Sequence, residues 1–103
     1  MKYTVYQIPF PTNKEEEKIY HRYAFAHLDW IDKVHFEYYK ETYSGDIDTQ
    51  NTKTYQILDD IFRELNLNHP DDYKGHSLSV SDIILIDGHY YYCDAYSWEE
   101  INI

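Results

Sequence analysis

The sequence is short of cysteine, glycine, proline and long hydrophobic runs, and each shortage excludes a class of protein. A single cysteine, Cys93, rules out an intramolecular disulfide and fits a reducing compartment. Three glycines and three prolines in 103 residues exclude a collagen-like or low-complexity chain. No apolar run approaches the roughly 20 residues of a membrane helix, and residues 1–7 are too polar for a secretory signal. We therefore expect a soluble, cytoplasmic protein.

Positive charge is also scarce. Nine Lys and Arg face 19 Asp and Glu, which gives a net charge of −10 and a pI of about 4.8. Such a chain is repelled by phosphate backbones and by anionic lipid surfaces, so we expect neither direct DNA binding nor membrane binding. A basic partner remains attractive at long range, although acidity can also serve solubility alone.

The acids are concentrated in the second part of the chain. Residues 1–43 hold seven acids and six bases, whereas residues 44–103 hold twelve acids and three bases. Such clustering indicates either a solvated surface or a binding face for a basic partner, and we favour the binding face. The predicted partner-binding residues are Asp46, Asp48, Asp59, Asp60, Glu64, Asp71, Asp72 and Asp87.

Apolar and aromatic residues are plentiful, at 43% and 18% of the chain, and they include 13 tyrosines. This is enough to bury one hydrophobic core, which predicts a single folded domain over residues 1–103. The run Tyr90-Tyr91-Tyr92 places rings on both faces of an extended segment. Tyrosine suits both core packing and protein interfaces, and the sequence leaves both roles open.

The first third of the chain predicts one strand and one helix. Alternation of apolar and aromatic residues predicts a strand over residues 3–8, which Pro9 ends. Asn13 is a suitable N-cap for the helix that follows. Apolar positions recur every three or four residues from Lys14 to about Trp30, which predicts the extent of this helix. A break near His27 is the alternative, because carboxylates such as Asp29 and Asp32 are unfavourable at a helix C-terminus.

The middle of the chain predicts a second strand and a second helix. Aromatic residues on alternating positions predict the strand over residues 34–43, and residues 44–46 carry the composition of a turn into a loop. Strong helical spacing of apolar residues follows over residues 55–65, and we expect Thr52 or Thr54 to cap this helix.

The last part of the chain predicts a hairpin. The apolar run at residues 83–86 reads as a buried strand, and Asp87-Gly88 is a strong signal for a type I′ turn. Residues 89–94 would form the return strand, and residues 98–103 a short closing element. The order β-α-β-α-β-β predicts an α+β fold: a small single domain with a mostly antiparallel sheet, two helices and a C-terminal hairpin.

The polar run that begins at Gly75 and ends at Asp82 contains the residue types of a nucleophilic site. Neighbouring residues of an extended segment point to opposite faces, which separates His76 from Ser77, and no Gly-x-Ser-x-Gly elbow is present. We favour a structural role in which Gly75 allows a tight turn. Ser77 and Ser81 would satisfy buried backbone groups, and Asp82 would bond nearby amides. The predicted structural motif comprises Gly75, His76, Ser77, Ser79, Ser81 and Asp82.

Six histidines raise the question of a metal or a nuclease site. No two of them lie four residues apart, as ligands on one helix face would, and no Cys-x-x-Cys is present. We therefore predict no metal, no cofactor and no catalytic residue, and hence a protein that is not an enzyme. One alternative stays open: a ribonuclease that uses His69 or His76 with a neighbouring carboxylate or tyrosine. Lys74 is the only local sign of a basic patch for RNA.

The second half of the chain carries a pattern typical of one family. It consists of Leu58-Asp59-Asp60-Ile61-Phe62, Asn66, the run from His69 to Ile83, and a hairpin with Tyr91-Tyr92 and Asp94. With the opening Tyr3-Thr4-Val5-Tyr6-Gln7 and the middle Tyr43-Ser44-Gly45, the chain closely resembles the YodL-like domain of proteins from Gram-positive mobile genetic elements. The resemblance covers nearly the whole chain and is most specific at residues 75–82.

The resemblance implies a function that the composition does not show. YodL-like domains are usually pieces of longer proteins, and the stand-alone acidic form is similar to type II-A anti-CRISPR proteins of plasmids and phages. This implies an inhibitor that binds the RNA-guided effector nuclease of the bacterial host, or its guide-RNA complex, and blocks guide-RNA loading or DNA access. The alternatives are a ribonuclease that truncates the guide RNA and a generic protein-interaction module.

Overall fold

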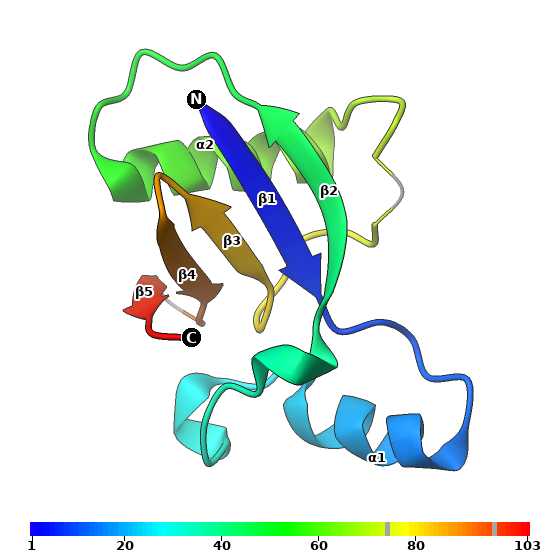
Figure 1. Ribbon diagram of the computed structural model, residues 1–103. Helices are drawn as coiled ribbons and strands as arrows, with labels where there is room; N and C mark the ends of the chain where they lie inside the picture. Colours follow the sequence, from blue (N-terminus) through cyan, green and yellow to red (C-terminus); the bar gives the residue numbers. More distant parts are fainter. Residues whose placement is uncertain (74, 96) are drawn as a thin grey trace.

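An antiparallel sheet forms the centre of the molecule (Figure 1). In the computed structural model, which describes residues 1–73, 75–95 and 97–103, this sheet has five strands in the order β2-β1-β3-β4-β5. The strands are β1 (Lys2–Gln7), β2 (Lys40–Asp46), β3 (Ile83–Ile86), β4 (His89–Cys93) and β5 (Trp98–Ile101), and the helices are α1 (Lys14–Tyr23) and α2 (Thr54–Leu67). The predicted α+β class, with two helices and a C-terminal hairpin, is confirmed.

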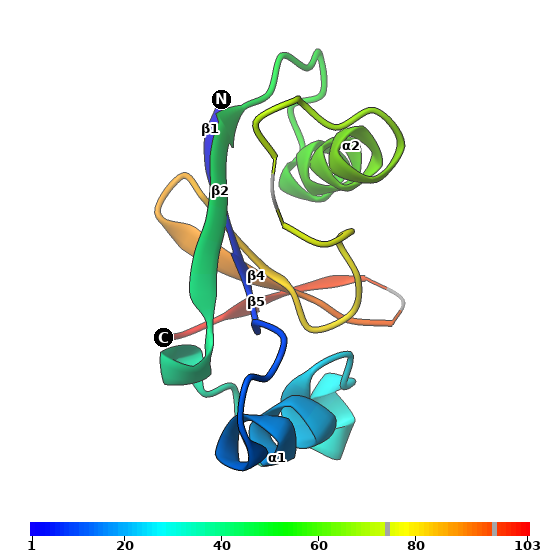
Figure 2. The ribbon, with the colours of Figure 1, turned by 90° about the vertical axis from the view of Figure 1, so that its right-hand side faces the viewer.

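The main hydrophobic core lies between the sheet and α2, which runs along one face of it (Figure 2). Helix α2 buries Ile57, Leu58, Ile61 and Leu65, in keeping with the apolar spacing of the sequence. Alternation along β1 directs Tyr3, Val5 and Gln7 toward the same side, and all three are buried. Neither helix among the described residues is long and apolar enough to cross a bilayer.

Helix α1 lies beyond the end of the sheet, and it is shorter than predicted (Figure 1). Asn13 caps it as expected, because its side-chain oxygen accepts the N–H of Glu16 at 2.8 Å. The predicted continuation to Trp30 is wrong, since the helix ends at Tyr23 and a short 3₁₀ turn follows at Leu28–Trp30. The chain leaves the helix at Ala24, whose ψ of 135° is extended, and the next residue, Phe25, has a left-handed φ of 61°. No residue of α1 is buried.

Strand β2 occupies residues that the sequence assigned to a turn. The predicted strand over residues 34–43 is wrong at its start, where Phe36–Tyr38 forms a 3₁₀ turn. The predicted turn at residues 44–46 is wrong too, because these residues pair with Thr4, Tyr3 and Lys2 of β1. Glycine at position 45 allows two tyrosine side chains to lie close to the backbone. A Cβ at this position would be 2.5 Å from Tyr43 Cε2 and 2.9 Å from Tyr3 Oη.

Of two local predictions, that of the β3–β4 turn is confirmed and that of the α2 cap is wrong. The β3–β4 turn has left-handed φ values at Asp87 (52°) and Gly88 (79°), as a type I′ turn requires, which confirms that prediction. The predicted cap of α2 is wrong, because the N-cap is Lys53 and it makes no side-chain capping bond. The predicted closing element of the chain is strand β5.

The close packing at Gly45 predicts the effect of adding one methyl group. Gly45→Ala should lower the free energy of unfolding by about 1–3 kcal/mol, because the two tyrosine rings must move to admit the Cβ. Urea unfolding measures the change, with the exposed neighbour Ser44→Ala as a control. Equal stability of Gly45→Ala and the wild type would contradict this packing.

Candidate functional site

The predicted acidic face is spread around α2 and its neighbouring loops. Asp46 ends β2, Asp48 follows it, and Asp87 lies in the β3–β4 turn. Asp71 and Asp72 follow the other end of α2. All five of these residues are exposed, so they carry negative charge at both ends of the helix.

Several of the predicted acids also have local structural partners that the sequence did not reveal. The carboxylate of Asp59 accepts a hydrogen bond from Trp98 Nε1 at 3.1 Å, which ties α2 to the edge strand β5. Asp60 accepts one from Thr49 Oγ1 at 2.6 Å, and this bond lowers the pKa of its carboxyl group. Glu64 is half-buried. Two loop acids have partners as well: Asp46 pairs with the N-terminal ammonium group at 2.9 Å, and Asp72 accepts a bond from Tyr43 Oη at 3.3 Å. The loop acids are nevertheless exposed, which makes them the better candidates for partner contact.

A buried polar network lies below this acidic region and explains the predicted structural motif. At its centre is Gln7 of β1, whose side-chain amide is fully buried. Its Nε2 donates to Asp82 Oδ2 at 3.0 Å and to the carbonyl oxygen of His76 at 2.9 Å. Asp82 Oδ2 also accepts the N–H of Ser79 at 3.0 Å. The network thus fastens residues 75–82, here called the motif loop, onto the sheet. Each of these polar groups would be costly to bury without a partner, and the hydrogen bonds offset that cost.

Ser81 extends the network toward α1. Its Oγ accepts the N–H of Phe25 at 2.9 Å, and its carbonyl accepts the hydroxyl of the mostly buried Tyr39 at 2.6 Å. Its own N–H donates to the carbonyl of Cys93 at 2.9 Å. Ser81 does this with a φ of 86°, which is unusual for a residue with a side chain. One serine therefore connects the motif loop, strand β4 and the segment after α1.

The structure adds detail at two motif residues. A Cβ at Gly75 would lie 2.5 Å from Gln7 Oε1, so the close approach of this backbone to the network favours glycine. Ser77 is exposed, whereas Ser81 is buried and accepts a backbone N–H. His76 Nδ1 lies 2.8 Å from the carbonyl oxygen of Ser77, so this contact between the two residues involves the backbone rather than the serine hydroxyl.

Burial has a clear electrostatic effect on Asp82. Only 1% of this residue is exposed, and burial raises the pKa of its carboxyl group to about 6. The hydrogen bonds from Gln7 and Ser79 act in the opposite direction, since they favour the ionised form. Burial likewise raises the pKa of the Tyr73 hydroxyl, which also bonds the His76 carbonyl, to about 12. The side chains of Asp82 and Tyr73 therefore form hydrogen bonds inside the fold and are not exposed to a substrate.

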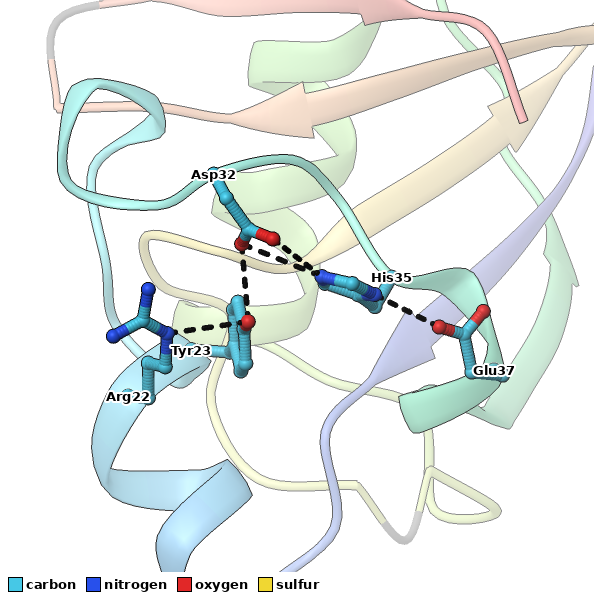
Figure 3. Close-up of polar contacts among 5 residues, drawn as sticks. All are labelled: Arg22, Tyr23, Asp32, His35 and Glu37. Atoms are coloured by element: carbon cyan, nitrogen blue, oxygen red, sulfur yellow. Dashed lines mark hydrogen bonds and ion pairs between the residues drawn. The ribbon is translucent and has the colours of Figure 1, made fainter.

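A second polar cluster lies on the surface between the end of α1 and the 3₁₀ turn at Phe36–Tyr38 (Figure 3). His35 stands between two carboxylates, with Nε2 3.1 Å from Asp32 Oδ2 and Nδ1 2.9 Å from Glu37 Oε1. Tyr23 Oη donates to Asp32 Oδ1 at 3.0 Å and receives a bond from Arg22 Nε at 3.2 Å. The hydrogen bond from His35 lowers the pKa of Asp32 to about 2.

This surface cluster links separate parts of the chain. The ring of His35 contacts Asp32 through Nε2 and Glu37 through Nδ1. The bond from Tyr23 Oη to Asp32 ties the segment after α1 back to the end of that helix.

The remaining histidine candidates are separate from one another. His69 Nδ1 contacts the neighbouring Pro70 carbonyl at 3.1 Å, and His76 belongs to the motif loop. Lys74, the residue named as a sign of an RNA-binding patch, lies outside the described residues. Across residues 1–73, 75–95 and 97–103, no three His, Cys, Asp or Glu side chains are grouped to hold a metal ion.

Comparison with known families matches nearly the whole chain. The YodL-like domain matches residues 2–103, from the start of β1 to the last residue. No curated protein and no solved structure matches the chain. The matched range includes the Gln7 amide, the motif loop and the acidic residues around α2.

The raised pKa of Asp82 predicts an unusual pH dependence of stability. The carboxyl group of the unfolded chain titrates near 3.8 and that of the folded chain near 6, so the folded state binds more protons between these values. Wild-type stability should therefore fall, relative to Asp82→Asn, by about 2 kcal/mol as pH rises from 4 to 6. Urea unfolding of both proteins across this range measures it. A difference between the two proteins that stays constant with pH would contradict the raised pKa.

Proposed function

Since the chain belongs to the YodL-like domain family, we propose that it is a non-enzymatic inhibitor of an RNA-guided effector nuclease of a type II-A CRISPR system. The inhibitor would bind the nuclease through the exposed acids around α2, and so block guide-RNA loading or DNA access. The partner would be the nuclease protein itself or its guide-RNA complex, and the inhibitor would make no direct contact with DNA. It would act in the cytoplasm of the bacterial host.

The observation that carries the proposal is the uneven charge of the molecule. Residues 44–103 hold twelve acids against three bases, and exposed acids lie in the loops at both ends of α2. Nucleases of this class hold the guide and its heteroduplex in a positively charged channel that recognises the backbone rather than the sequence. A rigid surface of carboxylates can occupy such a channel in place of phosphates.

We favour binding over catalysis as the mode of action. The carboxyl group of Asp82 is buried within a hydrogen-bonded network, away from any substrate, whereas the acids of the loops around α2 are exposed to a partner. Inhibition would therefore depend on occupancy of the nuclease, and one inhibitor molecule would be needed for each nuclease molecule.

Charge reversal in the loops around α2 tests the acidic surface. Asp48→Lys with Asp72→Lys should weaken binding to the apo-nuclease by about tenfold or more, because exposed charges set long-range attraction. Asp29→Lys with Glu41→Lys changes the net charge equally on exposed residues elsewhere, and should leave binding nearly intact. Calorimetric titration at two salt concentrations measures both effects, and wild-type binding should weaken at high salt. Binding unaffected by salt or by the loop reversals would refute the electrostatic mechanism.

The order of addition distinguishes the blocked steps. The protein is added to the nuclease before or after guide loading, and cleavage of a matched DNA is followed. Inhibition only before loading indicates competition with the guide RNA, whereas inhibition in both orders indicates a block of DNA access. Full cleavage in both orders, with no binding, would leave the generic interaction module as the better description.

A direct assay tests the enzymatic alternative. Guide RNA incubated with the purified protein alone, with and without magnesium, should remain full length on a denaturing gel. A shortened RNA whose formation is lost in His76→Ala or His69→Ala would instead establish a ribonuclease.

A further inference from the structure

Four aromatic rings meet in a closed circuit beside the motif loop, outside the main core. The ring centroids of Phe10 and Tyr20 are 5.7 Å apart, and those of Tyr20 and Phe25 are 5.9 Å apart. His76 closes the circuit, at 6.1 Å from Phe25 and 5.7 Å from Phe10. Phe10 is 64% exposed and Phe25 is 45% exposed, so this ring cluster opens to solvent. It unites the segment after β1, helix α1, the segment after α1 and the motif loop.

The backbone holds Phe25 in this cluster against its own preference. A φ of 61° is unfavourable for a bulky side chain, and the residue is fixed there by the bond from its N–H to Ser81 Oγ. Ser81 is itself in a left-handed conformation. These two unfavourable conformations support one another, and they do not serve to bury the ring of Phe25, since the residue remains 45% exposed. Strain that leaves an aromatic ring exposed is a mark of a recognition surface.

The charge around the ring cluster favours a cation. The faces of aromatic rings are electron-rich, and a buried carboxylate lies close behind His76. The Gln7 amide links the two, since its Nε2 is 3.0 Å from Asp82 Oδ2 and 3.2 Å from His76 Nδ1. A cationic side chain would gain from ring faces and from the negative potential of that carboxylate together, whereas a phosphate-bearing ligand would be repelled.

We propose that the ring cluster of Phe10, Tyr20, Phe25 and His76 binds the guanidinium group of an arginine presented by a peptide segment of a protein partner. Arginine fits better than lysine because its planar head is weakly hydrated and stacks on aromatic faces. The site is separate from the acids around α2 and holds whether or not the partner is a nuclease.

Nuclear magnetic resonance with small peptides tests the site directly. The probe is acetylated, amidated Gly-Arg-Gly, with matched peptides in which Arg is replaced by Lys or by the neutral isostere citrulline. The arginine peptide should shift the ring signals of Phe10, Tyr20 and Phe25 most, the lysine peptide less, and the citrulline peptide hardly at all. Equal shifts with citrulline would overturn the proposal, because they would show an apolar or amide site rather than a cation site.

Other occupants give results that also overturn the proposal. Ring signals that move with a short oligothymidylate, and not with the arginine peptide, would show a base-stacking site. Ring signals that change on dilution of the protein alone would show that a second copy covers the cluster.

Variants separate recognition from folding. Phe25→Gly removes the ring and suits the left-handed backbone, so its urea midpoint should equal or exceed that of the wild type. Its dissociation constant for the arginine peptide should nevertheless rise about two- to fivefold. Phe10→Ser should show the same loss, whereas Leu67→Ser, at a residue that is 79% exposed on α2, should not. Unchanged binding in both ring variants would overturn the assignment.

Discussion

The buried amide of Gln7 is the interaction on which the rest of the structure depends. It reaches from β1 to a carboxylate and a carbonyl of the motif loop, and without it Asp82 would be a buried charge with half its hydrogen bonds missing. The loop held in this way then presents Ser81 to the segment after α1. Helix α1 has no fully buried residue, so its placement relies on such bonds together with half-buried ring contacts such as that of Tyr20 with Phe10 at 5.7 Å.

Elements with strong local signals could be predicted from the sequence. Helix α2, strand β3 and the Asp87-Gly88 turn follow from apolar spacing and from turn chemistry, which act within a few residues. The elements that were misjudged depend on distant partners. The segment after α1 is held by a bond from Phe25 to Ser81, 56 positions away. Gly45 has the composition of a turn residue, and only the structure shows the two tyrosine rings packed against it.

The candidate site, too, could be predicted from the sequence only in part. Charge is additive along the sequence, so the acidity of residues 44–103 was visible at once. Which acids are committed to the fold was not visible, because Trp98 and Thr49 approach Asp59 and Asp60 only in three dimensions. Gln7 gave a faint signal: it is a polar residue at an inward position of an otherwise apolar alternation, and such a residue requires buried partners. The ring cluster gave none, since its members come from four segments.

The strand order places charged residues at the two exposed edges of the sheet. Strands β2 and β5 form the two edges of the sheet, where unpaired backbone groups could recruit a strand from another molecule. Charged residues occupy both edges, with Lys40 and Glu41 on β2, and Glu99 and Glu100 on β5. The pairing of β2 also shifts register between Val5 and Tyr6. A sheet this rich in tyrosine is thereby protected from edge-to-edge aggregation, so part of the charge keeps the molecule separate from its own copies.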